Sequence, residues 1–204
     1  MNIEIKDFEK DRVVHLSGEI DGDSLLQLKK DFGKILSSDY AVLVENCREL
    51  SKLGDVFVET YKKTTQRPSI TLDITSPGGK VYHALAMYDF IKGVISSGVN
   101  VECVATGLVA SAAMIVMLAC DKRYAMGNTS FMVHSLSGIT YGKLEDLKDD
   151  MEECLRLNTI ISNIYTSRTD ITSEKLKEVE VMKKDWWMDA DEALRLRLVT
   201  DKKL

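Results

Sequence analysis

The sequence predicts an α/β domain built from parallel β-α units. Two stretches carry this prediction, because in each a β-rich run leads through a glycine-containing turn into a segment with helical periodicity. In the first, residues 69–74 predict a strand that runs into a turn at 76–79 and a helix over 81–91. In the second, residues 99–105 predict a strand, and after a turn a helix begins at Ser111.

Two strands and a helix are predicted ahead of these units. Alternating apolar residues indicate strands over 3–5 and 13–16, the second ending near Gly18. Asp23 or Ser24 can cap the helix that follows, because a short polar side chain accepts a hydrogen bond from a free N–H of the first turn. The apolar positions of this helix recur near helical spacing, and they are Leu25, Leu26, Leu28, Phe32 and Ile35.

The pattern is least decisive over residues 40–66. The polar run at 37–39 ends the preceding helical pattern. Residues 41–44 then favour a strand, whereas Val56, Tyr61 and their neighbours suggest a helix. The pattern therefore allows a strand followed by a helix.

A long amphipathic helix is predicted over 143–164. Leu144, Leu147, Met151 and Leu155 recur along one side, and charged residues take other positions. Periodicity alone leaves two interpretations equally open. The apolar side packs on the core of the same chain, or it forms a contact surface for another chain.

Composition indicates an ordinary globular chain of 204 residues, with 45% hydrophobic and 29% charged residues. That length suits one substantial core, so we predict a single domain over 1–204. The net charge of −5 and the absence of a basic run argue against a nucleic-acid partner. The longest apolar stretch, 108–120, is too short to span a bilayer, and the charged N-terminus is unlike a signal peptide.

The four cysteines, Cys47, Cys103, Cys120 and Cys154, lack the paired spacing of a metal site. Cys103 and Cys120 lie in apolar surroundings, which favours buried free thiols. We therefore expect no metal, no cofactor and a reducing, cytoplasmic location.

Three short segments supply the groups that acyl transfer needs. The paired glycines Gly78 and Gly79 let the backbone approach a substrate closely and aim N–H groups at a developing oxyanion. Ser111 lies among alanines at the start of an apolar run, where a helix would direct its free N–H groups toward the hydroxyl. His134 ends an apolar strand 23 residues later, and histidine is the side chain best suited to proton transfer near neutral pH.

The two other histidines fit structural roles better. His15 alternates within a predicted strand, and His83 lies on the helix after the glycine pair. His134 instead ends a strand on the side of the sheet where the sites of α/β proteins gather.

The three segments, in this order, resemble the ClpP-type serine peptidases, which carry an S-P-G-G loop, a serine in a similar small-residue setting and a histidine after a strand. Residues 12–20 look like the first strand and turn of that family, and residues 187–201 look like its C-terminal segment. The resemblance implies a ClpP/crotonase-like α/β fold of repeated β-β-α units with a protruding handle helix at roughly 140–165. It thereby favours the contact-surface interpretation of the long amphipathic helix.

The resemblance also implies roles for the site residues. Ser111 would be the nucleophile and His134 the general base. The backbone N–H groups of Gly79 and Ala112 would form the oxyanion hole. Many relatives have methionine at the position of Ala112, but only the amide is needed there.

The acid of the triad would be Asp185, which lies two residues before Trp187, as the family's catalytic aspartate lies two before an aromatic residue. Asp189 opens an Asp-x-x-Glu capping pattern, and Asp191 falls in the first turn of the same predicted helix. Both carboxylates therefore have structural tasks. Glu180 is the remaining alternative for the acid.

The predicted function is that of a serine endopeptidase that cleaves unfolded proteins or peptides through an acyl-enzyme. The resemblance further implies a homo-oligomer of stacked heptameric rings, a tetradecamer joined through the handle helix, with a Clp-type ATPase as a further partner. Two features depart from the family's pattern: the segment before the first strand is shorter, and the 40–66 region is longer. Both differences bear on whether a Clp-type ATPase can dock.

Three alternatives remain, of which the first two are enzymes of the same broad superfamily and the third is from another class. They are a crotonase-superfamily acyl-CoA enzyme, a Ser-Lys hydrolase related to signal-peptide peptidases, and a non-catalytic ring scaffold subunit. The presence of a serine, a histidine and an acid argues against the scaffold, and no catalytic lysine is evident for the Ser-Lys class.

Overall fold

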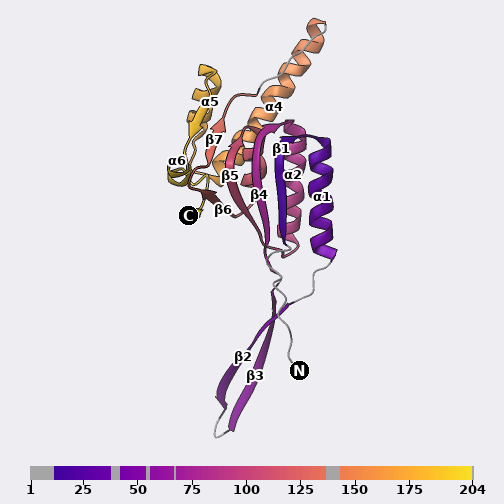
Figure 1. Cartoon of the computed structure of the whole chain (residues 1–204), viewed down its shortest axis with the longest axis vertical. Coiled ribbons are helices and arrows are strands. Elements are labelled where there is room, and N and C mark those ends of the chain that lie inside the picture. Colours follow the sequence, from indigo (N-terminus) through magenta and orange to yellow (C-terminus); the bar gives the residue numbers. More distant parts are fainter. Residues whose placement is uncertain (1–11, 38–41, 54–55, 67, 137–142, 204) are drawn as a thin grey trace.

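A computed structural model describes residues 12–37, 42–53, 56–66, 68–136 and 143–203 (Figure 1). Within these ranges the strands form a seven-stranded sheet and a separate two-stranded sheet. The strand predicted over residues 3–5 lies outside the described residues.

The larger sheet is parallel along its main path. Five strands lie side by side in the order β1 (Val13–Ile20), β4 (Ile70–Gly79), β5 (Val101–Ala110), β6 (Lys122–Met126) and β9 (Asp201–Lys203). Two further strands lie off this path: β7 (Ser130–Val133) pairs in parallel with the end of β5, and β8 (Trp186–Met188) pairs antiparallel with β7. The prediction of parallel β-α units is thus confirmed.

Two helices cover one face of the sheet beside β1 and β4. α1 (Gly22–Ser37) and α2 (Val81–Ser96) lie together there in Figure 1. Alternate strand residues such as Val14 and Leu72 are buried, as are the inward residues of the helices, such as Phe32. α3 (Ala112–Leu118), which follows β5, is different, because every one of its residues is buried.

The helices of the second half are α4 (Leu144–Arg168), α5 (Ser173–Met182) and α6 (Ala190–Arg195). α4 begins one residue after the predicted start and protrudes from the body in Figure 1. Its outer half leaves apolar side chains in solvent, with Met151 65% and Leu155 57% exposed. A helix packed on the core along its whole length is therefore the wrong interpretation. No helix of the described residues has the length and apolar character needed to cross a membrane.

The start of α1 differs from the predicted one. Asp21, rather than Asp23 or Ser24, caps the helix, because its Oδ1 accepts a hydrogen bond of 2.9 Å from the Ser24 N–H. Ser24 Oγ in turn accepts from the Asp21 N–H at 2.9 Å. This reciprocal pair of bonds is a capping box, in which Ser24 is the partner three residues on.

The helix predicted within residues 40–66 is wrong. β2 (Val42–Leu53) and β3 (Val56–Gln66) form an antiparallel hairpin that extends from the body at the end away from α4 (Figure 1). The sequence of β3 is rich in valine and threonine, which favour strands. Val56 and Val58 therefore belong to an alternating pattern and not to a helical one.

Candidate active site

Ser111 occupies a sharp turn between β5 and α3. Its backbone has φ 54° and ψ −125°, a conformation that costs a residue with a side chain about 1–3 kcal/mol. The turn is held from one side, because the Ser111 N–H donates to the Met132 carbonyl at 2.8 Å. Small neighbours, Ala110 and Ala112, are buried against it. The hydroxyl is thus presented by a fixed backbone.

His134 is brought to this turn by strand pairing. β7 pairs with the end of β5, with Met132 opposite Ala110. His134 follows β7, just as Ser111 follows β5, so the two side chains meet. His134 Nε2 lies 2.6 Å from Ser111 Oγ. A neutral imidazole that accepts at Nε2 carries its proton on Nδ1, so this contact suits proton transfer from the hydroxyl.

The Ser76–Gly79 segment, predicted as a loop, is the end of β4. After a bulge it continues to pair with β1, with Gly79 opposite Ile20. Gly78 has φ 100°, and a Cβ there would lie 2.8 Å from the Ser111 Cβ, closer than side chains come. Glycine at position 78 therefore allows β4 to approach the turn at Ser111. The Gly78 N–H donates to Ser76 Oγ at 3.1 Å, so it is already engaged.

A cleft of about 850 Å³ opens over these groups. Ser111, His134, Gly79 and Ala112 line its floor, together with Gly78. α4 and α5 supply further lining, in which the apolar side chains of Leu155, Ile161, Leu176 and Val179 stand beside polar ones such as Asn158. A cleft of this size and lining can hold an extended peptide with an apolar side chain next to Ser111.

The structure brings Asp185 near His134 in register but not into contact. β7 and β8 pair with Val133 opposite Trp186, so the next positions along the two chains are His134 and Asp185. Asp185 is exposed, and within the described residues no hydrogen bond joins it to His134.

The alternative acids have other partners. Asp189 caps α6 by accepting from the Glu192 N–H at 2.8 Å, as expected. A hydrogen bond from Lys202 lowers the pKa of Asp191. Glu180 lines the cleft and accepts from the Asn158 side chain at 3.0 Å.

The remaining histidines lie outside the cleft lining. His15 Nδ1 lies 3.0 Å from Asp73 Oδ2 on the exposed side of the sheet. His83 Nδ1 is buried, and no hydrogen-bond partner for it lies among the residues that the structure describes. Among the described residues no cluster of histidine, cysteine and acidic side chains could hold a metal ion.

Sequence reasoning missed the contribution of α5 to the cleft and the task of the Ser76 hydroxyl. Ser76 Oγ donates to the Gly18 carbonyl at 2.5 Å and so ties β4 to β1. Leu176 and Val179 line the cleft from α5, which is joined to α4 by the hydrogen bond from Asn158 to Glu180. The position of Ser76 in the S-P-G-G motif was a signal for its role. No local pattern in the sequence indicates that α5 lines the cleft.

Comparisons with known proteins agree with this geometry. The model of the Clp protease family matches residues 54–201. An ATP-dependent Clp protease proteolytic subunit of Deinococcus radiodurans is 31% identical over 168 residues, which cover 80% of each chain. A proteolytic subunit 3 of Rhizobium meliloti is 32% identical over 134 residues, covering 64% of this chain and 66% of the other.

The solved structure of a ClpP1 mutant from Listeria monocytogenes superposes with a TM-score of 0.72, over 98% of this chain and 96% of that one. At 22% identity this likeness shows the fold. Fold, serine–histidine pair and relatives together define a serine-type peptidase. The chain belongs to the Clp protease family.

Proposed function

We propose that this peptidase cleaves unfolded proteins and peptides internally, through an acyl-enzyme formed on Ser111 by a Ser111–His134–Asp185 triad. The observation that carries the proposal is the 2.6 Å contact between Ser111 Oγ and His134 Nε2 at the floor of a peptide-sized cleft. A serine hydroxyl needs such a base, because it is a weak nucleophile at neutral pH.

The reaction begins when Ser111 Oγ attacks the carbonyl carbon of the scissile bond while its proton passes to His134 Nε2. The carbonyl oxygen becomes an oxyanion, which the N–H groups of Gly79 and Ala112 stabilise. The intermediate then expels the amine, which takes the proton from His134, and leaves an ester on Ser111. Water then attacks the ester while its proton passes to His134. Ser111 Oγ leaves, takes the proton back from His134, and the carboxylic acid product is released.

Asp185 is the acid in this proposal. Its support is the β7–β8 register, whose last pair is Val133 and Trp186, the neighbours of His134 and Asp185. The alternatives Asp189 and Asp191 already have other partners in and near α6. A carboxylate that accepts from Nδ1–H keeps the imidazole in the tautomer that takes up the serine proton.

We also propose that the chain works as stacked heptameric rings, a tetradecamer joined through α4. The exposed apolar side chains of its outer half support this, because such side chains call for a covering surface. The relatives named as ATP-dependent proteolytic subunits suggest a Clp-type ATPase as the source of unfolded substrate. The buried free thiols of Cys103 and Cys120 fit the reducing cytoplasm.

A fluorophosphonate probe tests the chemistry, because it reacts rapidly only with an activated serine. We expect one labelled peptide that contains Ser111, together with hydrolysis of a fluorogenic peptide. A non-catalytic scaffold would show neither. An acyl-CoA enzyme would turn over a thioester and leave the peptide intact. Light scattering on the same sample reports whether active protein is a ring assembly.

A further inference from the structure

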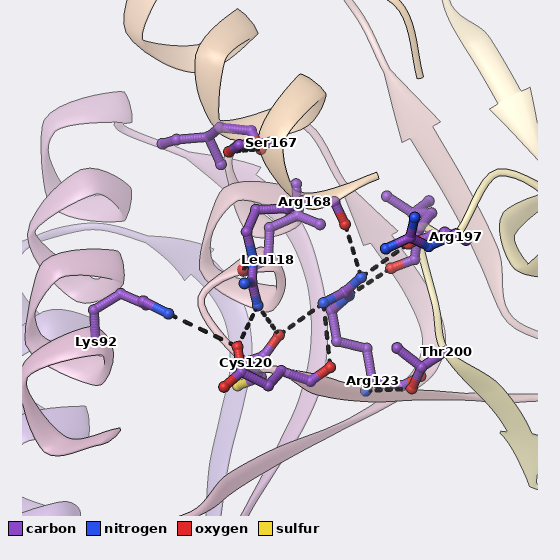
Figure 2. Close-up of polar contacts among 11 residues, drawn as sticks. Lys92, Leu118, Cys120, Arg123, Ser167, Arg168, Arg197 and Thr200 are labelled. Carbon is purple, nitrogen blue, oxygen red and sulfur yellow. Dashed lines mark hydrogen bonds and ion pairs between the residues drawn. The ribbon is translucent and has the colours of Figure 1, made fainter. Parts of the chain in front are cut away.

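A cluster of polar contacts lies away from the cleft, at the far end of α3 (Figure 2). At its centre is Arg123 on β6, which is 3% exposed. Burial lowers the pKa of its guanidinium, and backbone carbonyls compensate for the lost water. The guanidinium donates to the carbonyls of five residues, which are Cys120, Asp121, Arg168, Arg197 and Leu198.

Arg168, the last residue of α4, takes part in this cluster through both its backbone carbonyl and its guanidinium group. Its carbonyl accepts from Arg123 at 3.0 Å. Its guanidinium donates to the Leu118 carbonyl at 3.0 Å, the Cys120 carbonyl at 2.9 Å and Asp121 Oδ1 at 2.6 Å. Figure 2 shows this side chain directed at the end of α3. The Arg168 side chain thus donates hydrogen bonds to three acceptors at or just beyond the end of α3.

One of these acceptors, the Leu118 carbonyl, is a group that a helix end leaves unpaired, and the other two follow just after the helix. The last carbonyls of a helix have no partner within it, and a positive charge there also matches the helix dipole. α3 has seven residues, so it is about 10 Å long. One end of this short, wholly buried helix is held by Arg168, and its other end carries Ser111 and the Ala112 N–H.

The strained turn at Ser111 depends on how both ends of α3 are held. A backbone with φ 54° persists only where the surroundings fix it on all sides. The Met132 carbonyl holds the turn at the N-terminal side of α3. A corresponding hold at the C-terminal side prevents the helix from moving along its axis and relaxing the turn.

We propose that Arg168 is a positioning residue for the nucleophile: through α3 it holds Ser111 Oγ and the Ala112 N–H in catalytic register. This inference rests on the proposed role of Ser111. Arg168 lies at the base of the handle helix and touches no reacting atom. Its effect is therefore expected on turnover and not on substrate binding.

The test replaces Arg168 by glutamine, which cannot span three acceptors, and by lysine, which keeps the charge without the forked donors. The control is Arg197→Gln, because the Arg197 side chain is 69% exposed and pairs with Asp170 at 3.0 Å without touching α3. For each assembled protein, kcat and KM for a fluorogenic peptide are measured with the rate constant of fluorophosphonate labelling. Light scattering and thermal melting accompany both measurements.

We expect Arg168→Gln to lower kcat and the labelling rate constant together, each about tenfold, with KM changed less than about twofold. Arg168→Lys should fall between this variant and the parent, and Arg197→Gln should match the parent. If Arg168→Gln does not fold, the same joint fall in Arg168→Lys supports the proposal.

A lower melting temperature with unchanged labelling in a folded Arg168 variant would reduce Arg168 to a stabilising residue. A loss of rate that disappears when higher protein concentration restores the assembly would also overturn the proposal. Labelling of a residue other than Ser111 in the parent protein would instead refute the proposed function, whatever Arg168 does.

Discussion

α3 consists of apolar side chains, whereas the outer half of α4 carries apolar side chains among charged ones, and the surroundings of the two sets differ. All seven residues of α3 are buried within one chain. In the outer half of α4, Leu144 is 66% and Met151 65% exposed. The apolar groups of α3 have partners already, so this helix is a rigid mount for Ser111. Those of the outer half of α4 have little cover among the described residues, which agrees with the proposed contact between chains.

Removing the nucleophile separates the two regions most strongly. Ser111→Ala should lower peptide hydrolysis by about 10⁶-fold, because the loss of the nucleophile alone is about as severe as the loss of the whole triad. The assembled mass and the melting temperature should stay as in the parent, since α4 is untouched. A fluorogenic peptide assay and light scattering check both. More than about a thousandth of the parent rate would show that Ser111 is not the nucleophile.

The acid gives the next largest effect. Asp185→Asn should lower kcat by about 10⁴-fold, because the imidazole then loses the tautomer that accepts the serine proton. Asp189→Ala is the matched control, and it should instead cost about 1 kcal/mol of stability as a lost helix cap. Activity and urea unfolding of both variants decide this. The opposite assignment of effects would mean that Asp189 is the catalytic acid.

Charging the exposed side of α4 tests the other half of the comparison. Glutamate at both Met151 and Leu155 should divide stacked rings into single rings or smaller species, because charge would be buried without a partner at the contact. The melting temperature of the dissociated chain should change little, since both positions are exposed within it. Sedimentation reports the size. A parent protein that is monomeric at micromolar concentration and still cleaves peptides contradicts the ring proposal.

A pair of glycines extends the comparison to buried and open positions. Gly78→Ala should lower the stability of the fold by at least about 2 kcal/mol and remove most of the activity. Position 78 has φ 100°, which disfavours alanine, and the new methyl group would collide with the turn at Ser111. Gly93→Ala, on α2, meets no atom within 4 Å and should add up to about 1 kcal/mol of stability. Thermal and urea unfolding measure both changes. Equal effects would show that β4 does not approach α3 as described.

The sequence alone located the fold class and the serine–histidine pair. Strand, glycine turn and helix recur with the periods that distinguish a strand from a helix, and parallel units put Ser111 and His134 at the same edge of the sheet. Local patterns were less reliable at the ends of elements, since Asp21 caps α1 and residues 76–79 extend β4.

Other features depend on pairings that no local pattern reveals. The hairpin β2–β3 was misread in part because short runs of valine and tyrosine fit two periods. The position of Asp185 opposite His134 follows from the register of β7 and β8. The contacts of Arg168 with α3 involve mainly backbone carbonyls, which every residue has and which therefore leave no mark in the sequence.

The hairpin also has a bearing on how the chain could acquire or lose a segment. Val42 and Gln66 face each other at its base, so 25 residues begin and end within about 5.5 Å. Although the hairpin has 25 residues, the distance between its two ends is close to the distance that one or two residues would span, so it adds little to the path from α1 to β4. Because β2–β3 forms a sheet of its own, we expect that it can lengthen, shorten or change its sequence without altering the pairing of β4 with β1. The fold thus leaves a free attachment point on a body whose catalytic geometry tolerates little change.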